Sequence, residues 1–126
     1  MNLNQVTMPT NDMEATNAFY LLLGFRQIVD TPHYARFECP TGDATFSLSL
    51  VDELKYNPTI IYFEHEELDE WANNLLDKGL SFDEMPQDMS FLWREAKLTD
   101  PAGNKIKLYW AGENRKNPPW RVDITK

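Results

Sequence analysis

Apolar and polar residues alternate on both sides of a short turn near the end of the chain. Ala96 and Leu98 are apolar positions before the turn, and Ile106 and Leu108 are the equivalent positions after it. The turn, residues 100–104, reads Asp-Pro-Ala-Gly-Asn, and these residue types favour a tight reversal of the backbone. The pattern predicts a β-hairpin with one apolar face and one chemically mixed face. On alternation alone, an ordinary hairpin with one face in solvent is the simpler interpretation.

A second hairpin of the same form occurs earlier, which indicates an internal repeat. Pro40 and Gly42 lie in its turn, as Pro101 and Gly103 lie in the later one. Each hairpin follows a strand-like segment and an amphipathic helical segment, and each helical segment closes at a glycine. The chain is therefore predicted to hold two tandem modules, each built from a strand, a helix and three further strands.

These patterns set the expected elements and their boundaries. Helices are expected at about residues 11–23 and 66–78, and Asn11 is the expected N-cap of the first. Strands are expected at residues 3–9, 25–30, 34–38, 44–51, 59–63, 91–98 and directly after 104, with a break at Met85-Pro86. The predicted fold class is α+β, in a single domain over residues 1–126. Its parts are module one at 1–54, module two at 58–112 and a C-terminal tail at 113–126.

The tail carries an alternating apolar pattern outside the repeat. Trp120, Val122 and Ile124 alternate with polar residues, and Pro118 and Pro119 precede them. Because a tryptophan gains most when its large apolar surface is covered, the tail is expected to be ordered. We expect it to pack Trp120 against its own body or against a second subunit.

Composition narrows the functional classes. The chain has 20 acidic and 12 basic residues and a formal net charge of −8. Nucleic acids and anionic membranes repel such a charge and are not expected as partners. Cationic ligands are compatible with this negative charge, and solubility alone is the simpler explanation of it. With one cysteine, Cys39, no intrachain disulfide can form. The sequence has no apolar run of membrane-spanning length and no signal-peptide pattern, so a cytoplasmic location is expected.

Several of these segments together resemble one known family. The Asn-Asp pair at residues 11–12, the Leu-Gly-Phe at 23–25, and the turn at 100–104 with its following aliphatic strand are similar to the vicinal oxygen chelate superfamily. This superfamily includes glyoxalase I, bleomycin-resistance proteins, fosfomycin-resistance proteins and extradiol dioxygenases. The resemblance implies a glyoxalase-like fold, in which two βαβββ modules form a half-barrel cleft.

The resemblance also implies strand positions at which members of the superfamily hold a divalent metal. In this sequence those positions are Gln5, Ser47, Ile60 and Lys107. Gln5 offers a carbonyl oxygen, but Ser47 is a poor neutral ligand and Ile60 has no donor atom. Lys107 places an ammonium where a carboxylate is usual, and its charge repels a divalent cation. No metal and no other cofactor are therefore expected, nor is glyoxalase or dioxygenase activity carried by those ligands.

The mixed faces of the strands supply candidate ligand-binding residues. Alternation places the following side chains at the predicted cleft: Gln5, Thr7, Tyr34, Arg36, Ser47, Tyr62, Trp93, Glu95, Lys107 and Tyr109. Aromatic faces with a few polar groups suit a small planar or cationic ligand. Hydrophobic fill is an equally open interpretation of the same aromatic residues.

Three functions remain open from the sequence. The chain is most similar in character to the metal-free, bleomycin-resistance-like members, which implies a homodimer that binds a small organic molecule. The alternative is a lyase or isomerase with a metal-free mechanism. Lys107 is its candidate catalytic residue, because a buried amine has a lowered pKa, which Glu95 or Arg36 would set. The third is an interaction module with a filled cleft. Whether the protein is an enzyme stays open.

Overall fold

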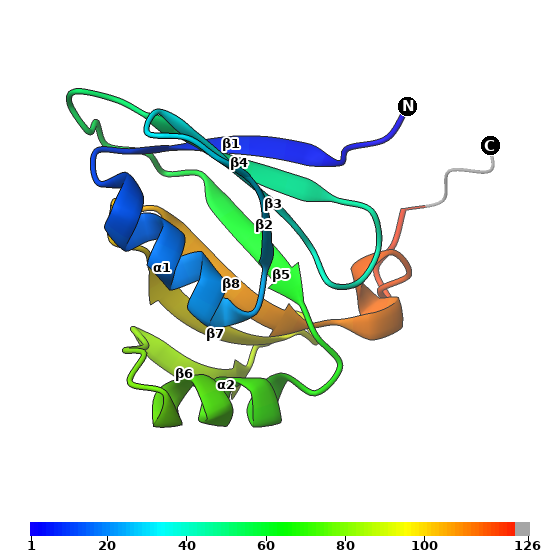
Figure 1. The fold of residues 1–126 in the computed structure, drawn as a ribbon. Helices are drawn as coiled ribbons and strands as arrows, with labels where there is room; N and C mark the ends of the chain where they lie inside the picture. Colours follow the sequence, from blue (N-terminus) through cyan, green and yellow to red (C-terminus); the bar gives the residue numbers. More distant parts are fainter. Residues whose placement is uncertain (123–126) are drawn as a thin grey trace. The chain divides into compact units, whose positions relative to one another are not determined.

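The computed structural model describes residues 1–122 and contains two four-stranded sheets and two α-helices (Figure 1). The prediction of an α+β fold with two tandem modules is confirmed. The elements of the first module are β1 (Gln5–Thr10), α1 (Met13–Leu23), β2 (Arg26–Asp30), β3 (Tyr34–Glu38) and β4 (Thr45–Leu50). Those of the second are β5 (Ile60–Glu64), α2 (Leu68–Asp77), β6 (Glu84–Asp88), β7 (Arg94–Thr99) and β8 (Lys105–Trp110), followed by the 3₁₀ helix η1 (Gly112–Arg115).

Both sheets have the same strand order. The first runs β1-β4-β3-β2, with β1 parallel to β4 and the remaining neighbours antiparallel. The second runs β5-β8-β7-β6, so each strand of the second module takes the place of its counterpart in the first. The chain divides into two compact units. Unit 1 comprises Met1–Thr59 and Thr99–Lys105, and unit 2 comprises Ile60–Leu98 and the residues from Ile106 onward.

Aromatic residues form much of the core of unit 1. The helix α1 buries Tyr20, whose ring centroid lies 4.9 Å from that of Phe46 on β4 and 5.9 Å from that of Phe37 on β3. Phe37 and Phe46 also stack on each other at 5.1 Å. Leu48 is fully buried two residues beyond Phe46. Because side chains alternate along a strand, the residues between these apolar positions point to the opposite face of the sheet.

The ends of α1 are fixed by local hydrogen bonds, and its N-cap is one residue later than expected. Asp12, rather than Asn11, is the N-cap, since its carboxylate accepts a hydrogen bond from the backbone N–H of Ala15 at 3.1 Å. Thr10 supports this start by accepting the N–H of Asp12. Gly24 closes the helix with a φ of 107°, a left-handed conformation that glycine adopts without strain.

Unit 2 has the same arrangement of apolar residues with smaller side chains. The helix α2 buries Leu68, Ala72 and Leu75. The apolar face of its sheet is formed by buried residues of β7 and β8, namely Ala96, Leu98, Ile106 and Leu108. The strand β7 begins at Arg94 instead of the expected residue 91. The guanidinium of Arg94 binds Asp69 of α2 and Asp88 of β6.

The expected break at Met85-Pro86 is wrong, because both residues lie inside β6. This strand is at the edge of its sheet, and its register with β7 shifts between Glu84 and Gln87. Proline has no N–H for a sheet ladder, and an irregular edge strand tolerates that loss. The proline that predicts a break in the sequence instead marks an edge strand.

The turn at residues 100–104 packs into unit 1 through a buried carboxylate. Asp100 accepts hydrogen bonds from the backbone N–H groups of Ala102 and Asn104 and from the Asn104 side chain, each at 2.9 Å. The Tyr20 hydroxyl donates to the same carboxylate at 2.7 Å. Gly103 has a φ of 86°, which explains the glycine in this turn.

The tail continues from η1 with an exposed tryptophan. Trp120 is 57% exposed, so it is not buried against its own unit as one form of the expectation required. Packing on a second subunit stays a prediction. Ile124, the last residue of the expected alternation, lies outside the described residues.

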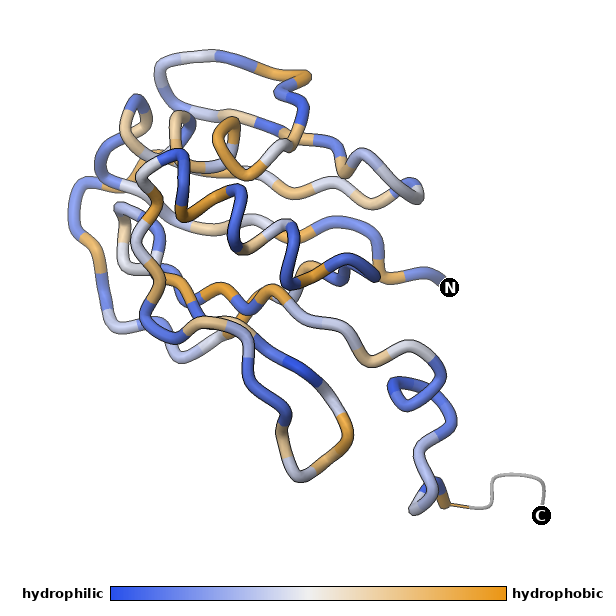
Figure 2. The backbone as a smooth tube through the Cα atoms, turned by 90° about the horizontal axis from the view of Figure 1, so that it is seen from below, coloured by the Kyte–Doolittle hydropathy of each residue, from blue (hydrophilic) through white to orange (hydrophobic). Residues whose placement is uncertain are grey.

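Hydrophilic and hydrophobic stretches alternate along the backbone (Figure 2). Within residues 1–122, no helix is long and apolar enough to cross a membrane.

Candidate functional site

The predicted site residues fall into two sets, one in each unit. Gln5, Thr7, Tyr34, Arg36 and Ser47 belong to β1, β3 and β4 of unit 1. Tyr62, Glu95, Lys107 and Tyr109 belong to β5, β7 and β8 of unit 2, and Trp93 directly precedes β7. Alternation puts each set on the sheet face opposite the buried apolar residues.

A continuous hydrogen-bond network joins four of the predicted residues in unit 1. The Gln5 side-chain amide donates to the Ser47 hydroxyl at 2.8 Å, and that hydroxyl lies 2.5 Å from the Tyr34 hydroxyl. Arg36 donates to the Tyr34 oxygen through Nε at 3.2 Å and Nη2 at 3.0 Å. Thr45 adds a hydrogen bond to the Gln5 carbonyl. Thr45 was absent from the predicted set, although it precedes Ser47 by two residues and therefore shares its face.

This network changes the acidity of Tyr34. Hydrogen bonds from Ser47 and Arg36 lower the pKa of the Tyr34 phenol, and the positive charge of Arg36 acts in the same direction. The guanidinium carbon of Arg36 also lies 5.4 Å from the centre of the Tyr34 ring. The Tyr34 hydroxyl is thus held by two N–H groups of Arg36 and by the buried hydroxyl of Ser47. All three residues lie on strands.

Unit 2 presents an aromatic cluster. The rings of Trp93 and Tyr109 stack with centroids 4.8 Å apart, and Tyr62 meets both edge-on at 6.0 and 5.4 Å. Phe91 extends the cluster, with its ring 5.8 Å from that of Trp93. Tyr109 is buried, whereas Tyr62 is exposed. The cluster therefore combines a buried inner ring with an accessible outer ring.

An ion pair lies beside these rings. Lys107 Nζ is 3.0 Å from Glu95 Oε2, and the two side chains are 17% and 1% exposed. Lys107 Nζ is also 5.4 Å from the centre of the Tyr62 ring. Glu95 Oε1 has no hydrogen-bond partner among the described residues.

The expected lowering of the Lys107 pKa is wrong. Burial acts to lower this pKa, but the hydrogen bond and negative charge of Glu95 outweigh it and raise the pKa. Glu95, one of the two neighbours considered from the sequence, is in contact with Lys107. Lys107 is therefore a protonated partner of Glu95 near neutral pH rather than a free amine.

Two further residues in unit 2, Glu64 and Arg115, were not among the predicted site residues. The Glu64 carboxylate accepts hydrogen bonds from the backbone N–H groups of Ala111 and Gly112 at 2.9 and 3.1 Å. Burial and the charge of Glu64 raise the pKa of Tyr109, against a smaller lowering by Arg115. Nothing in the sequence pattern indicates the contact between Glu64 and the chain after β8.

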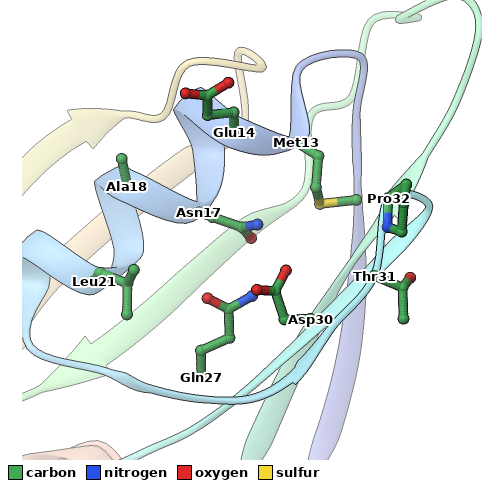
Figure 3. A pocket seen from close by; sticks show the side chains of 9 residues that line it. All are labelled: Met13, Glu14, Asn17, Ala18, Leu21, Gln27, Asp30, Thr31 and Pro32. Carbon is green, nitrogen blue, oxygen red and sulfur yellow. The ribbon is translucent and has the colours of Figure 1, made fainter.

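A separate pocket of about 520 Å³ lies on unit 1. In Figure 3, Asn17 of α1 and Gln27 and Asp30 of β2 extend toward one another across it. Asn17 Oδ1 is buried without a hydrogen-bond partner in the part of the chain described. The complete lining is Met13, Glu14, Asn17, Ala18, Leu21, Gln27, Asp30, Thr31 and Pro32. None of these was a predicted site residue.

A sequence model of the Glyoxalase/Bleomycin resistance protein/Dioxygenase superfamily matches residues 2–108. The chain belongs to this superfamily. No curated protein matches it significantly.

Solved structures of the superfamily share the fold. A glyoxalase/bleomycin resistance protein/dioxygenase from Nocardioides is 20% identical, with a TM-score of 0.76 over 98% of this chain and 90% of that chain. A bleomycin-binding protein in complex with bleomycin is 19% identical, with a TM-score of 0.71 over 87% and 98% of the two chains. A lactoylglutathione lyase from Agrobacterium tumefaciens is 16% identical, with a TM-score of 0.72 over 92% and 96%. At these identities the likeness shows the fold alone.

The residues at the superfamily's metal positions do not fit a divalent ion. Ile60 has no donor atom, and Ser47 is already engaged by Gln5 and Tyr34. Lys107 is a cation held by Glu95. No cluster of three or more His, Cys, Asp or Glu suited to a metal occurs within residues 1–122.

Proposed function

We propose that this member of the superfamily binds a small planar organic molecule at the aromatic cluster of unit 2, without using the superfamily's metal site. The observation that carries the proposal is the stacked pair of Trp93 and Tyr109 beside the Lys107–Glu95 ion pair. Aromatic faces provide apolar contact with defined geometry, and a nearby charged pair orients polar groups of the ligand. The exposed ring of Tyr62 offers a surface against which such a molecule can pack.

The raised pKa of Lys107 supports binding over covalent catalysis. A Schiff base requires the neutral amine, and Glu95 favours the charged form. A metal-free lyase or isomerase that uses Lys107 is the competing proposal. Trapping with borohydride in the presence of an aldehyde separates the two, since a stable adduct at Lys107 supports the enzyme.

A thermal-shift screen across antibiotics, aldehydes and aromatic acids tests the binding proposal. The best compound is then titrated into wild-type protein and into Trp93→Leu, with Trp120→Leu as a matched control for the loss of an indole. We expect Trp93→Leu to weaken binding about tenfold, equivalent to one lost aromatic contact, and Trp120→Leu to leave it unchanged. Equal affinity for the wild type and Trp93→Leu contradicts the proposal, as does a screen with no shift.

We also propose that the protein is a cytoplasmic homodimer. The exposed ring of Trp120 supports a second-subunit contact, because an uncovered tryptophan loses the benefit of its apolar surface. Sedimentation velocity over a range of protein concentrations tests the assembly, and a single monomeric species at all of them contradicts it.

A further inference from the structure

The hydrogens of the unit 1 network can be assigned from the chemistry of its members. Gln5 Nε2 lies 3.2 Å from the backbone carbonyl of Val6, which can only accept, so the amide nitrogen faces Val6. The Gln5 carbonyl therefore accepts from Thr45, and its second N–H donates to Ser47. The orientation of the amide is thus set by a backbone group.

The Gln5 amide also determines the direction of the hydrogen bond between Ser47 and Tyr34. Ser47 is completely buried, and its oxygen already accepts from Gln5. The Tyr34 oxygen is the one remaining acceptor that the hydrogen bonds of residues 1–122 offer to its hydroxyl hydrogen. Because an unsatisfied buried donor is costly, Ser47 donates to Tyr34.

The Tyr34 hydroxyl is left with a hydrogen to donate. Its oxygen accepts from Ser47 on one side and from two N–H groups of Arg36 on the other, which occupies both lone pairs. Its own hydrogen has no acceptor among the described residues. The lowered pKa of the phenol agrees with this arrangement, since all of these contacts favour negative charge on its oxygen.

Arg36 is a cation without a counter-ion among residues 1–122. Its Nη1 has no hydrogen-bond acceptor within the described chain, and no carboxylate there forms an ion pair with it. Lys107, by contrast, already has Glu95 at 3.0 Å. Arg36 is half-buried, so its charge is less screened than that of an exposed arginine.

We propose that Tyr34 and Arg36 form a recognition site for the carboxylate of a small organic acid. The hydroxyl of Tyr34 and the free N–H groups of Arg36 supply adjacent donors, as carboxylate binding requires. Ser47 and Gln5 act as positioning residues. The net charge of −8 opposes an anion at long range, but distant charges are screened beyond about 8 Å at physiological ionic strength.

The inference goes beyond the proposed function, because it names a ligand class for a site within unit 1, and it can be tested separately. Benzoate and benzamide have the same ring and differ in the carboxylate. We expect calorimetric titration to show about tenfold or tighter binding of benzoate. Tyr34→Phe and Arg36→Gln are each expected to reduce that preference about tenfold, the loss typical of one hydrogen bond to a charged group.

Controls match each change. Tyr56→Phe removes a hydroxyl from a tyrosine that is 91% exposed, and Arg26→Gln removes a charge from the neighbouring strand β2. Both are expected to keep the benzoate preference. Ser47→Ala is expected to reduce it and to raise the pKa of Tyr34, a response that a purely structural serine does not give.

The outcomes separate the two proposals. Equal binding of benzoate and benzamide, or a preference insensitive to both Tyr34→Phe and Arg36→Gln, overturns the carboxylate site even if other ligands depend on Trp93. Failure to detect benzoate binding also overturns it. A benzoate preference that depends on Tyr34 and Arg36 supports the site whether or not Trp93→Leu has an effect, and the aromatic binding proposal is decided by its own titration.

Discussion

The hydrogen bond between Tyr20 and Asp100 is expected to contribute measurably to stability. It joins α1 to the turn at residues 100–104 within unit 1 and is shielded from water, since Tyr20 is 0% and Asp100 is 3% exposed. Tyr20→Phe removes the donor and keeps the ring that packs on Phe46. Asp100 retains its bonds from Ala102 and Asn104, so its carboxylate is not left without donors.

A hydrogen bond to a charged group contributes about 1.5–3 kcal/mol, and the retained donors favour the lower part of that range. We expect Tyr20→Phe to cost about 1.5–2 kcal/mol at pH 7, or about 5–8 °C in Tm for a chain of this length. Urea unfolding followed by circular dichroism measures the difference. Tyr56→Phe, which alters an exposed tyrosine, is expected to stay within about 0.5 kcal/mol of wild type.

The hydrogen bond between Tyr20 and Asp100 also predicts that the contribution of Tyr20 to stability falls at alkaline pH. Burial, together with the charge and hydrogen bond of Asp100, raises the pKa of Tyr20. The folded state therefore keeps this proton while the unfolded state loses it above about pH 10. The contribution of Tyr20 is fully present below that pH and falls by about 1.4 kcal/mol per pH unit above it.

The difference in free energy of unfolding between wild type and Tyr20→Phe should consequently narrow from pH 10 upward. Other tyrosines are common to both proteins and cancel in the comparison. A Tyr20→Phe protein as stable as wild type at pH 7, or a gap that stays constant through pH 11, refutes this reasoning.

Three further predictions follow from particular contacts. Tyr34→Phe should remove a phenolate signal at 295 nm whose midpoint lies below the ordinary tyrosine value of about 10; an unchanged titration curve contradicts the network. Gly103→Ala should cost about 1–2 kcal/mol in urea unfolding, because φ is 86° and the added carbon meets nothing within 4 Å, which leaves backbone strain as the cost. Deletion of residues 117–126, including Trp120, should shift sedimentation toward monomer; identical sedimentation and Tm show that the tail is a passive extension.

The repeated fold was predictable because local signals agreed with one another. Alternation, turn chemistry and glycine-closed helices recur twice, and each is decided by neighbours in sequence. The errors fall where tertiary context decides. Asp12 rather than Asn11 caps α1 because its backbone is placed by Thr10, and Pro86 lies in a strand because that strand is at an edge. Trp120 was expected to be covered, and a single chain does not cover it.

Residues on the candidate faces were found by parity, but their partners were not. Alternation put Ser47, Tyr34 and Arg36 on one face without indicating that Ser47 links Gln5 to Tyr34. It likewise could not give the sign of the Lys107 pKa shift. Burial and an adjacent carboxylate act in opposite directions on a lysine, so the sign depends on a distance that only the folded chain provides.

Lys107 and Glu95 allow the charges on one face of the unit 2 sheet to be changed without altering its core. Lys107 lies between Ile106 and Leu108, which face the core, so the side chain at 107 can change without altering that packing. A carboxylate at position 107 would stand beside the buried Glu95. We therefore expect Lys107→Glu to destabilise the protein by about 3–5 kcal/mol, since it breaks a buried pair and brings like charges together. The charge swap Lys107→Glu with Glu95→Lys should recover more than half of that loss in urea unfolding, because opposite charges again face each other. If the swap is no more stable than Lys107→Glu alone, the pair is not what holds these two residues in place.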